Sequence, residues 1–270
     1  MTKDSGFRYS ILASGSSGNA FYVETKKQRL LIDAGLTGKK ITSLLAEINR
    51  KPEDLDAILI THEHSDHIKG VGVLARKYHL DIYANEKTWE IIDDKEMLGK
   101  IATEHKHIFS RDEMLTFGDL DIESYGVSHD AQDPQFYRIM KDNKSFVMLT
   151  DTGYVSDRMA GLIENADAYL IESNHDIDIL RSGAYPWHLK QRILSDKGHL
   201  SNEDGAETMI RTLGNRTKKI YLGHLSKENN IKELAHMTME HQLMAADIGV
   251  GSDLKVLDTS PDEACPLTNI

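Results

Sequence analysis

Short β-rich runs alternate with helical patterns along nearly the whole chain, and this alternation limits the folds that the sequence can adopt. Between the runs, apolar residues recur at helical spacing, for example from Ile41 to Ile48 and from Ala206 to Leu213. We therefore expect an α/β fold in which mixed β-sheets are flanked by helices. The predicted strands are residues 7–13, 20–24, 29–33, 57–61, 81–84, 121–127, 136–140, 146–150, 168–172, 219–222 and 254–257.

The 270 residues contain no Pro-rich or Gly/Ser-rich linker, and the five prolines are scattered. We expect one domain over residues 1–270. The net charge of −11 argues against a broad basic surface for nucleic acid, so a polyanion would have to be held locally. Two divalent cations would supply about +4 at one point, which is enough to dominate a site in an acidic protein.

Cys265 is the only cysteine, which excludes an intrachain disulfide and a thiolate metal cluster. A reducing cytosol fits this composition best. The first apolar run, Tyr9 to Ala13, is short, and no apolar stretch reaches 18 residues. We expect a cytoplasmic protein that is neither exported nor bound to a membrane.

Four possible metal ligands lie within six residues, directly after the predicted strand 57–61. In an extended chain His62 and His64 point to the same side and can face one ion. As the chain turns towards a helix that opens near Ile68, Asp66 and His67 can face a second ion. Imidazole and carboxylate suit zinc, manganese or iron. The alternative is a polar loop with several exposed histidines.

Two stretches of the chain share one pattern. In each, a hydrophobic strand ends in Asp-x-Gly, a helix follows, and the next strand ends in polar residues. The aspartates, Asp33 and Asp151, are 118 positions apart (151 minus 33), and the following strands lead to His62 and Glu172. Two βαβ halves related by duplication would bring these strand ends to a common edge. A chance similarity is the alternative.

The His-x-His-x-Asp-His stretch resembles the signature of the metallo-β-lactamase superfamily, and the order of the later motifs matches from Tyr9 to Leu257. The resemblance implies a four-layer αββα sandwich with two divalent metal ions. Asp33 would support the ligand loop. One ion would take His62, His64, His129 and Asp151, and the other would take Asp66, His67, Asp151 and His224. Taken alone, His129 would more often be structural, and Asp33 and Asp151 would be helix caps.

Two ions would lower the pKa of a bridging water, and the resulting hydroxide would attack without a protein nucleophile. We predict that Asp66 is both a metal ligand and a catalytic residue. The serine-rich residues 14–19 lack the spacing of a hydrolase elbow or a P-loop. We interpret them as a tight turn; the alternative is that the turn contacts phosphate, with Ser16 and Asn19 as the binding residues.

Asp151 in the bridging position points to the phosphodiesterase and thioesterase branches of the superfamily, and His64 disfavours the iron redox branch. Glu172 and His199 resemble the proton relay of nucleic-acid-processing members such as ribonuclease Z, although Leu200 interrupts the match. By this resemblance His199 binds the scissile phosphate and protonates the leaving oxygen, and Glu172 orients it. His175 is the alternative candidate for this general acid. Alternatively, His199 and Ser201 merely cap a helix from residue 202.

A local basic stretch between residues 181 and 197 contains one acid and two aromatic residues. A phosphate backbone would lie there, with Arg181 and Lys190 as binding residues together with Ser201, and with Tyr185 and Trp187 available for base stacking. An amphipathic helix with solvated lysines explains the stretch equally well.

The chain resembles most the YycJ/WalJ subgroup, through residues 14–19, 128–131, 172–176 and 199–202. This resemblance implies exonuclease action on DNA rather than RNA and a functional link to a cell-wall-regulating two-component system. Two alternatives remain open. One is a small-molecule phosphodiesterase, lactonase or thioesterase with the same two-metal centre, and the other is a non-catalytic metal-binding regulatory protein. The native metal, the final choice between DNA and RNA, the cleavage polarity and the oligomeric state stay open.

Overall fold

The protein is described by a computed structural model that covers residues 6–270. The chain forms two compact units. Unit 1 comprises Met1–Gly126, described from residue 6, together with Ala131–Lys141 and Thr259–Ile270, and unit 2 comprises Val127–Asp130 and Asp142–Asp258. The single-domain organisation stays a prediction, and its residues 1–5 lie outside the described part. Among residues 6–270, no helix is long and apolar enough to cross a membrane.

Unit 1 contains a mixed seven-stranded sheet in the order β14-β1-β2-β3-β4-β5-β6. These strands are β1 (Arg8–Ala13), β2 (Ala20–Glu24), β3 (Arg29–Ile32), β4 (Ala57–Leu59), β5 (Asp81–Ala84), β6 (Lys106–Ile108) and β14 (Thr268–Asn269). Pairing is antiparallel from β14 to β3 and parallel from β3 to β6. An antiparallel set follows: β7 (Met114–Phe117), β8 (Leu120–Gly126) and β9 (Gln135–Lys141).

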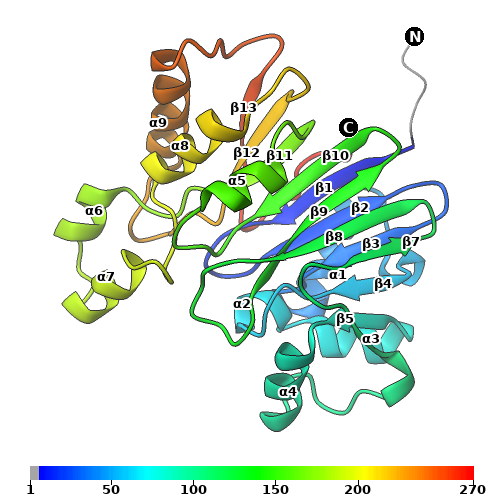
Figure 1. Cartoon of the computed structure of the whole chain (residues 1–270). Helices are drawn as coiled ribbons and strands as arrows, with labels where there is room; N and C mark the ends of the chain where they lie inside the picture. The colour runs from blue at the N-terminus through cyan, green and yellow to red at the C-terminus, as the bar shows by residue number, and fades with distance from the viewer. Residues whose placement is uncertain (1–5) are drawn as a thin grey trace. The chain divides into compact units, whose positions relative to one another are not determined.

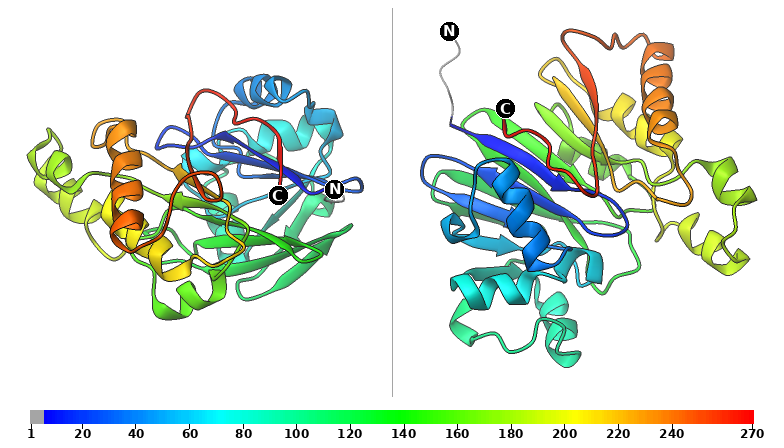
Figure 2. Two further views of the ribbon diagram at one scale, coloured as in Figure 1. Left: turned by 90° about the horizontal axis from the view of Figure 1, so that it is seen from above. Right: turned by 180° about the vertical axis from the view of Figure 1, so that it is seen from behind.

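Helices of unit 1 close a core of branched side chains against this sheet. They are α1 (Gly38–Glu47), α2 (Ser65–Ile68), α3 (Val71–Tyr78), α4 (Glu86–Asp94) and two 3-10 turns, η1 (Pro52–Asp54) and η2 (Thr103–His105). Helix α1 begins at a Thr37 cap and buries Ile41, Leu44 and Leu45, as its spacing predicted, in a cluster with residues of β1 to β5. Figure 2 shows α1 lying over the first strands.

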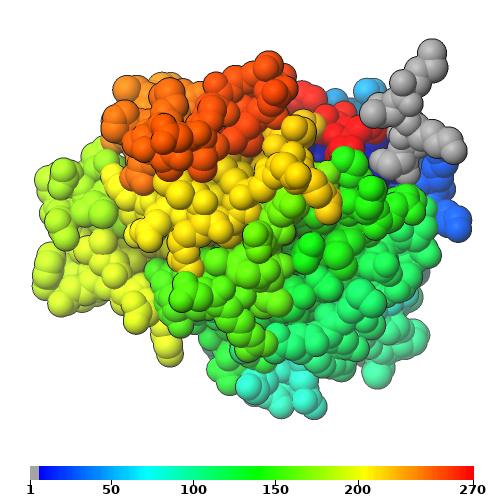
Figure 3. All heavy atoms as spheres, turned by 45° about the horizontal axis from the view of Figure 1, so that its top comes forward, coloured from blue at the N-terminus to red at the C-terminus, as the bar shows by residue number. Residues whose placement is uncertain are grey.

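Unit 2 is built on four parallel strands: β10 (Lys144–Leu149), β11 (Ala168–Glu172), β12 (Lys219–Gly223) and β13 (Lys255–Asp258). Its helices are α5 (Asp157–Ile163), α6 (Ile177–Ser182), α7 (Trp187–Ile193), α8 (Asn202–Thr212) and α9 (Lys232–Ala245). Helix α9 packs on α8 and β13, and in Figure 3 the orange atoms of α9 lie against the yellow atoms of α8.

In each unit the parallel register brings successive loops to one sheet edge (Figure 1). In unit 1, Leu31 pairs with Ile58, so the loops after β3 and β4 leave the sheet together. In unit 2, Leu149 pairs with Ile171, and Glu172 pairs with Gly223. The polar residues that follow these strands therefore lie where an α/β sheet places its sites.

All eleven predicted strands are present, with ends within two residues of those expected. The strand predicted to reach Thr61 ends at Leu59, because the Thr61 N–H donates to the Asp33 carboxylate and not to a neighbouring strand. The helix expected near Ile68 begins earlier, at Ser65, so that prediction was wrong: Asp66 lies in the first turn, where an acid stabilises the helix terminus. Three short strands, β6, β7 and β14, were not predicted.

Candidate metal and catalytic site

Residues 61–67 follow β4 in unit 1, and we call them the ligand loop. They are held by buried polar contacts. His62 and His67 are buried, whereas His64 and Asp66 are half-buried. His62 Nε2 lies 3.1 Å from His64 Nδ1. Two imidazole nitrogens at this separation suit a shared cation or an N–H···N hydrogen bond. The loop thus brings the two histidines of the motif together, as the spacing predicted.

Asp33, at the end of β3, fixes the start and the end of this loop. Its Oδ1 accepts from the Thr61 N–H (2.9 Å), and its Oδ2 accepts from Thr61 Oγ1 (2.8 Å). The same Oδ2 lies 2.8 Å from His67 Nδ1. Because a carboxylate only accepts, His67 carries its proton on Nδ1, and its Nε2 is an acceptor. Asp33 thus contacts both ends of the loop, and its role as a support for metal ligands stays a prediction.

Asn19 also lies against the ligand loop. Its Nδ2 is 3.1 Å from His67 Nε2 and 3.4 Å from Asp66 Oδ2, and its Oδ1 accepts from the Gly15 N–H. The serine-rich turn is therefore fastened to the loop through Asn19. Ser16, in the same turn, is exposed.

Glu63 is a residue of the motif whose role the sequence analysis missed. It is buried, and its Oε1 accepts from the Gln132 N–H at 2.8 Å. The signal was present, because Glu63 lies between His62 and His64 and must point to the other side of an extended chain. It ties the ligand loop to the segment Ala131–Lys141.

In unit 2, the carboxylate of Glu172 is the hub of a histidine pair. Glu172 ends β11 and is fully buried. Its Oε1 lies 2.7 Å from His199 Nδ1 and 2.9 Å from His224 Nδ1, and its Oε2 accepts from the Thr152 N–H at 2.9 Å. The carboxylate therefore fixes the orientation of both rings, with Nδ1 protonated and Nε2 turned to the opposite side. The contact of Glu172 with His199 was predicted from the sequence, and that with His224 was not.

Glu172 stays ionised although it is buried. Burial alone would raise its pKa, but the attraction and hydrogen bonds of His199, together with the hydrogen bond of His224, lower the pKa to about 2. An ionised carboxylate is an acceptor throughout the neutral range. Glu172 therefore serves to orient the histidines and does not carry the proton itself.

Asp151 and His224 follow β10 and β12 and approach each other beside this hub. Asp151 Oδ1 lies 3.4 Å from His224 Nδ1 and 3.9 Å from His199 Nδ1. Asp151, Glu172, His199 and His224 each place one possible ligand atom within 4.8 Å of the others. Carboxylate and imidazole groups gathered this closely suit a divalent cation. Asp151 and His224 of this cluster were predicted as metal ligands, whereas Glu172 and His199 were predicted as a proton relay, and these assignments stay predictions.

His129 and His175 are also buried beside this cluster. His129 Nε2 lies 3.9 Å from Asp151 Oδ1, and its Nδ1 lies 3.2 Å from the Gly198 carbonyl oxygen. Burial lowers the pKa of His129 and lowers that of His175 to about 4. Both rings are therefore neutral at pH 7. His175 Nδ1 has no hydrogen-bond partner among the described residues, whereas His199 has Glu172.

Two of the predicted substrate-binding residues have structural contacts instead. Ser201 caps α8, where its side chain and that of Asp204 form a capping box. Lys190 is buried, and its Nζ donates to two backbone carbonyls, so it is not a solvated cation for phosphate. These placements favour the capping alternative for Ser201 and correct the expectation for Lys190. Arg181 is exposed.

Comparison with known proteins identifies the family of the chain. Residues 28–225 match the model of the beta-lactamase superfamily domain. The chain is 77% identical over 265 residues to exodeoxyribonuclease WalJ of Streptococcus pneumoniae, covering 98% of each chain. It is 52% identical over 256 residues to exodeoxyribonuclease YycJ of Bacillus anthracis, covering 95% of this chain and 96% of the relative.

A solved structure shows the same fold at low sequence identity. The metallo-β-lactamase fold protein YhfI of Bacillus subtilis superposes with a TM-score of 0.72 at 18% identity, covering 96% of this chain and 99% of that one. The predicted α/β fold with two mixed sheets flanked by helices is confirmed.

Proposed function

Because the chain belongs to the metallo-β-lactamase superfamily, we propose that it is a metal-dependent phosphodiester hydrolase that acts as an exonuclease on DNA. The observation that carries this proposal is the identity of 77%, over nearly the full length, with a protein named as an exodeoxyribonuclease. The buried Glu172 hub supports it, because it holds two histidines in a fixed tautomer beside Asp151.

We assign two divalent ions to this chain from the motif order of the superfamily. One ion would be held by His62, His64, His129 and Asp151, and the other by Asp66, His67, Asp151 and His224. When bound, such ions lower the pKa of a shared water and neutralise negative charge on the phosphoryl oxygens. The carboxylates behind His67 and His224 support the assignment, because metal-binding histidines usually donate their second N–H to such a partner.

His199 is the residue that we place at the leaving oxygen. Its Nδ1 proton is held by Glu172, so Nε2 is the atom that gives a proton to the departing 3′ or 5′ oxygen. After the transfer the ring is neutral and keeps the Nδ1 proton. His175 is the weaker candidate, because no carboxylate in the described chain holds its Nδ1.

The proposal is tested by incubating the purified protein with end-labelled single- and double-stranded DNA and RNA, with Zn²⁺ or Mn²⁺ supplied in turn. We expect stepwise shortening of DNA from one end, faster than that of RNA, and loss of activity with a chelator. Metal analysis of the same preparation should give two ions per chain. Turnover of a small phosphodiester without any shortening of DNA would overturn the nuclease assignment.

A cytoplasmic location and a functional link to a two-component system belong to the same proposal. The first rests on the single Cys265, and the second on the resemblance to the YycJ/WalJ subgroup. Cell fractionation tests the location. Deletion of the gene, followed by measurement of transcripts controlled by the two-component system, tests the link.

A further inference from the structure

Trp187, the first residue of α7, is an unusually exposed aromatic residue. Its exposed fraction is 64%, whereas the other tryptophan of the chain, Trp89, is 5% exposed. Leu194, seven residues later and therefore on the same helical face, is 39% exposed. A large aromatic ring held in water is informative, because its burial against a partner would be favourable.

The helix pair that carries Trp187 is held rigid from inside. We call residues 177–197, which contain α6 and α7, the α6–α7 arm. Lys190 Nζ donates to the carbonyl oxygens of Arg181 and Gly183, both at 2.7 Å, and so closes the turn between the helices. Pro186 precedes α7 and fixes the backbone before Trp187. Trp187 is thus presented by an ordered element, and little conformational entropy is lost when it binds.

Besides Trp187, the α6–α7 arm exposes charged side chains of both signs. The α6–α7 arm has four basic and two acidic residues, in a chain whose net charge is −11. Two of the basic residues have internal partners: Lys190 is buried, and Arg192 pairs with Asp130. Arg181 and Lys197 are exposed, and so are the two acids of the arm, Asp178 and Asp196. An exposed aromatic ring and exposed cations on the same element are the combination that binds an unpaired nucleic-acid strand.

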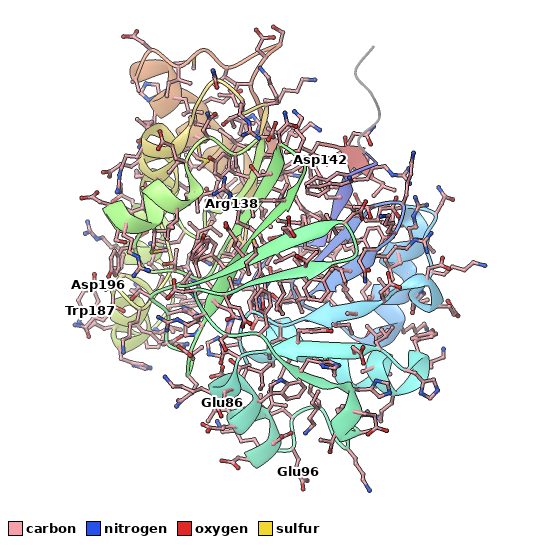
Figure 4. All side chains as sticks on the ribbon, turned by 45° about the vertical axis from the view of Figure 1, so that its right-hand side comes forward. Glu86, Glu96, Arg138, Asp142, Trp187 and Asp196 are labelled. Atoms are coloured by element: carbon pink, nitrogen blue, oxygen red, sulfur yellow. The ribbon has the colours of Figure 1, made fainter. Side chains whose placement is uncertain are left out.

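The α6–α7 arm is joined directly to the catalytic residues of unit 2. The His199 N–H donates to the carbonyl oxygen of Ile193, the last residue of α7, at 3.1 Å. Arg192 pairs with Asp130, the neighbour of His129 in sequence. Figure 4 labels Trp187 and Asp196 on the same outer edge. A strand bound at Trp187 would therefore be held on the body that carries His199.

We propose that the α6–α7 arm binds the unpaired strand of the DNA substrate, with Trp187 stacked on one base and with Arg181 and Lys197 beside the phosphates. The inference rests on the proposed nuclease function and names the surface that the substrate uses. Stacking does not distinguish one base from another, so the arm would bind any sequence. The same arm would discriminate against a fully paired end, whose bases are not available for stacking.

The test is binding of the metal-loaded protein to a single-stranded oligodeoxynucleotide with uncleavable phosphorothioate linkages. We expect quenching of the fluorescence of exposed Trp187. Since stacking on one base contributes on the order of a tenfold change in affinity or more, Trp187→Ala should raise the Kd about tenfold, and Trp187→Phe should restore most of the affinity. Met237→Ala is the matched control, because Met237 is 65% exposed on α9 of the same unit.

The charge contribution is tested separately. Arg181→Ala and Lys197→Ala should each weaken binding and reduce its dependence on salt concentration, by a slope of about 0.7 for each phosphate of a single strand that the variant no longer neutralises. Lys232→Ala, an exposed lysine of α9, should change neither. Hydrolysis of a small phosphodiester should be unchanged in the two control variants, Met237→Ala and Lys232→Ala, which lie outside the α6–α7 arm.

Failure of the arm and failure of the proposed function give different results. If the wild-type protein shortens DNA but Trp187→Ala binds and degrades single strands as well as wild type does, the arm proposal is wrong. If Trp187 fluorescence does not respond to DNA although DNA is degraded, another partner occupies this surface, and the proposal is equally wrong. If wild type binds DNA through Trp187 but never shortens it, the nuclease function fails and the binding surface stands.

Discussion

The Asp-x-Gly turns of the two units both begin with an aspartate in the left-handed region but use its carboxylate differently. Asp33 and Asp151 each follow a parallel strand, and both have left-handed backbones, with φ of 58° and 57°, a conformation that aspartate tolerates better than most residues. In unit 1 both oxygens of the Asp33 carboxylate accept hydrogen bonds, from Thr61 and from His67. In unit 2 the Asp151 carboxylate lies among histidine rings.

The glycines of the two turns show why the backbone repeats. A Cβ on Gly35 would lie 1.5 Å from the carbonyl oxygen of Asp66, and a Cβ on Gly153 would lie 2.2 Å from the backbone of Asp196. In each unit, therefore, the absence of a side chain at this glycine lets another backbone segment, which carries polar site residues, pass close to the turn. The turn fixes where the chain passes, and the neighbouring side chains decide which groups its aspartate contacts.

The comparison is tested most severely by Asp151→Ala. If Asp151 binds both ions, its removal should empty the site and lower kcat on DNA by about 1,000-fold or more, since metal ions stabilise the transition state by several kcal/mol. Metal analysis and single-turnover kinetics measure the two effects. Asp157→Ala, which alters an exposed aspartate of the same unit, is the control. Full activity of Asp151→Ala would remove the distinction between the two turns.

His199→Ala should have the next largest effect. We expect metal content close to that of wild type and a fall in kcat of about 100-fold or more, because a general acid is lost while the proposed ligands remain. Substrates with a better leaving group, such as a nitrophenyl phosphodiester, should be affected less. The control is His241→Ala, at an exposed position of α9. A metal-free His199→Ala protein would show that His199 is a ligand, and the division of roles in unit 2 would be wrong.

Asp33→Ala should be milder than Asp151→Ala, because Asp33 acts through His67 and Thr61. Loss of such a partner usually reduces metal affinity or activity about 10- to 100-fold. Titration with Zn²⁺ and kinetics at saturating metal separate the two: added metal should restore much of the activity of Asp33→Ala but none of that of Asp151→Ala. Asp56→Ala, at an exposed aspartate of unit 1, should be silent. Equal damage from the two variants would mean that both aspartates have the same role.

The repeated pattern also shows what the sequence could and could not reveal. Strands such as β2, β5 and β11 were predicted with their observed bounds, because apolar residues and turn residues mark them locally. Strand β6 was missed, because its three residues, Lys106 to Ile108, are mostly polar and pair only with β5. Strand β14 was missed because it depends on pairing with β1, at the opposite end of the chain.

Among the site residues, the sequence revealed those that occur in motifs and not those defined by a tertiary contact. The spacing of the histidines predicted the ligand loop. The bond between Glu172 and His224, across 52 positions, had no local signal. Lys190 was interpreted as a surface cation because its neighbours in sequence are basic, but its Nζ is satisfied by two carbonyl oxygens of the preceding turn. Burial, which sequence does not report directly, decided its role.

Replacement of Glu24 should have the smallest effect on activity. This buried carboxylate of unit 1 bonds Tyr22 and Arg50, which are not proposed site residues. It accepts hydrogen bonds from Tyr22 Oη (2.6 Å) and from Arg50 Nε (2.6 Å) and Nη2 (2.7 Å). Burial raises its pKa, but the bonds from Arg50 and Tyr22 outweigh burial and leave the pKa below its usual value.

The sign of the pH effect follows from this lowered pKa. Glu24 stabilises the folded state fully above its unfolded pKa of about 4.3, and this stabilisation is lost as the pH falls through the lower folded pKa. Glu24→Gln should therefore lower the unfolding free energy at pH 7 and reduce its dependence on pH below about 5, with kcat changed less than about twofold. Urea unfolding at pH 7 and at more acidic pH measures this. A Glu24→Gln protein with unchanged stability and reduced turnover would show that carboxylates of unit 1 outside the Asp33 turn also serve the chemistry.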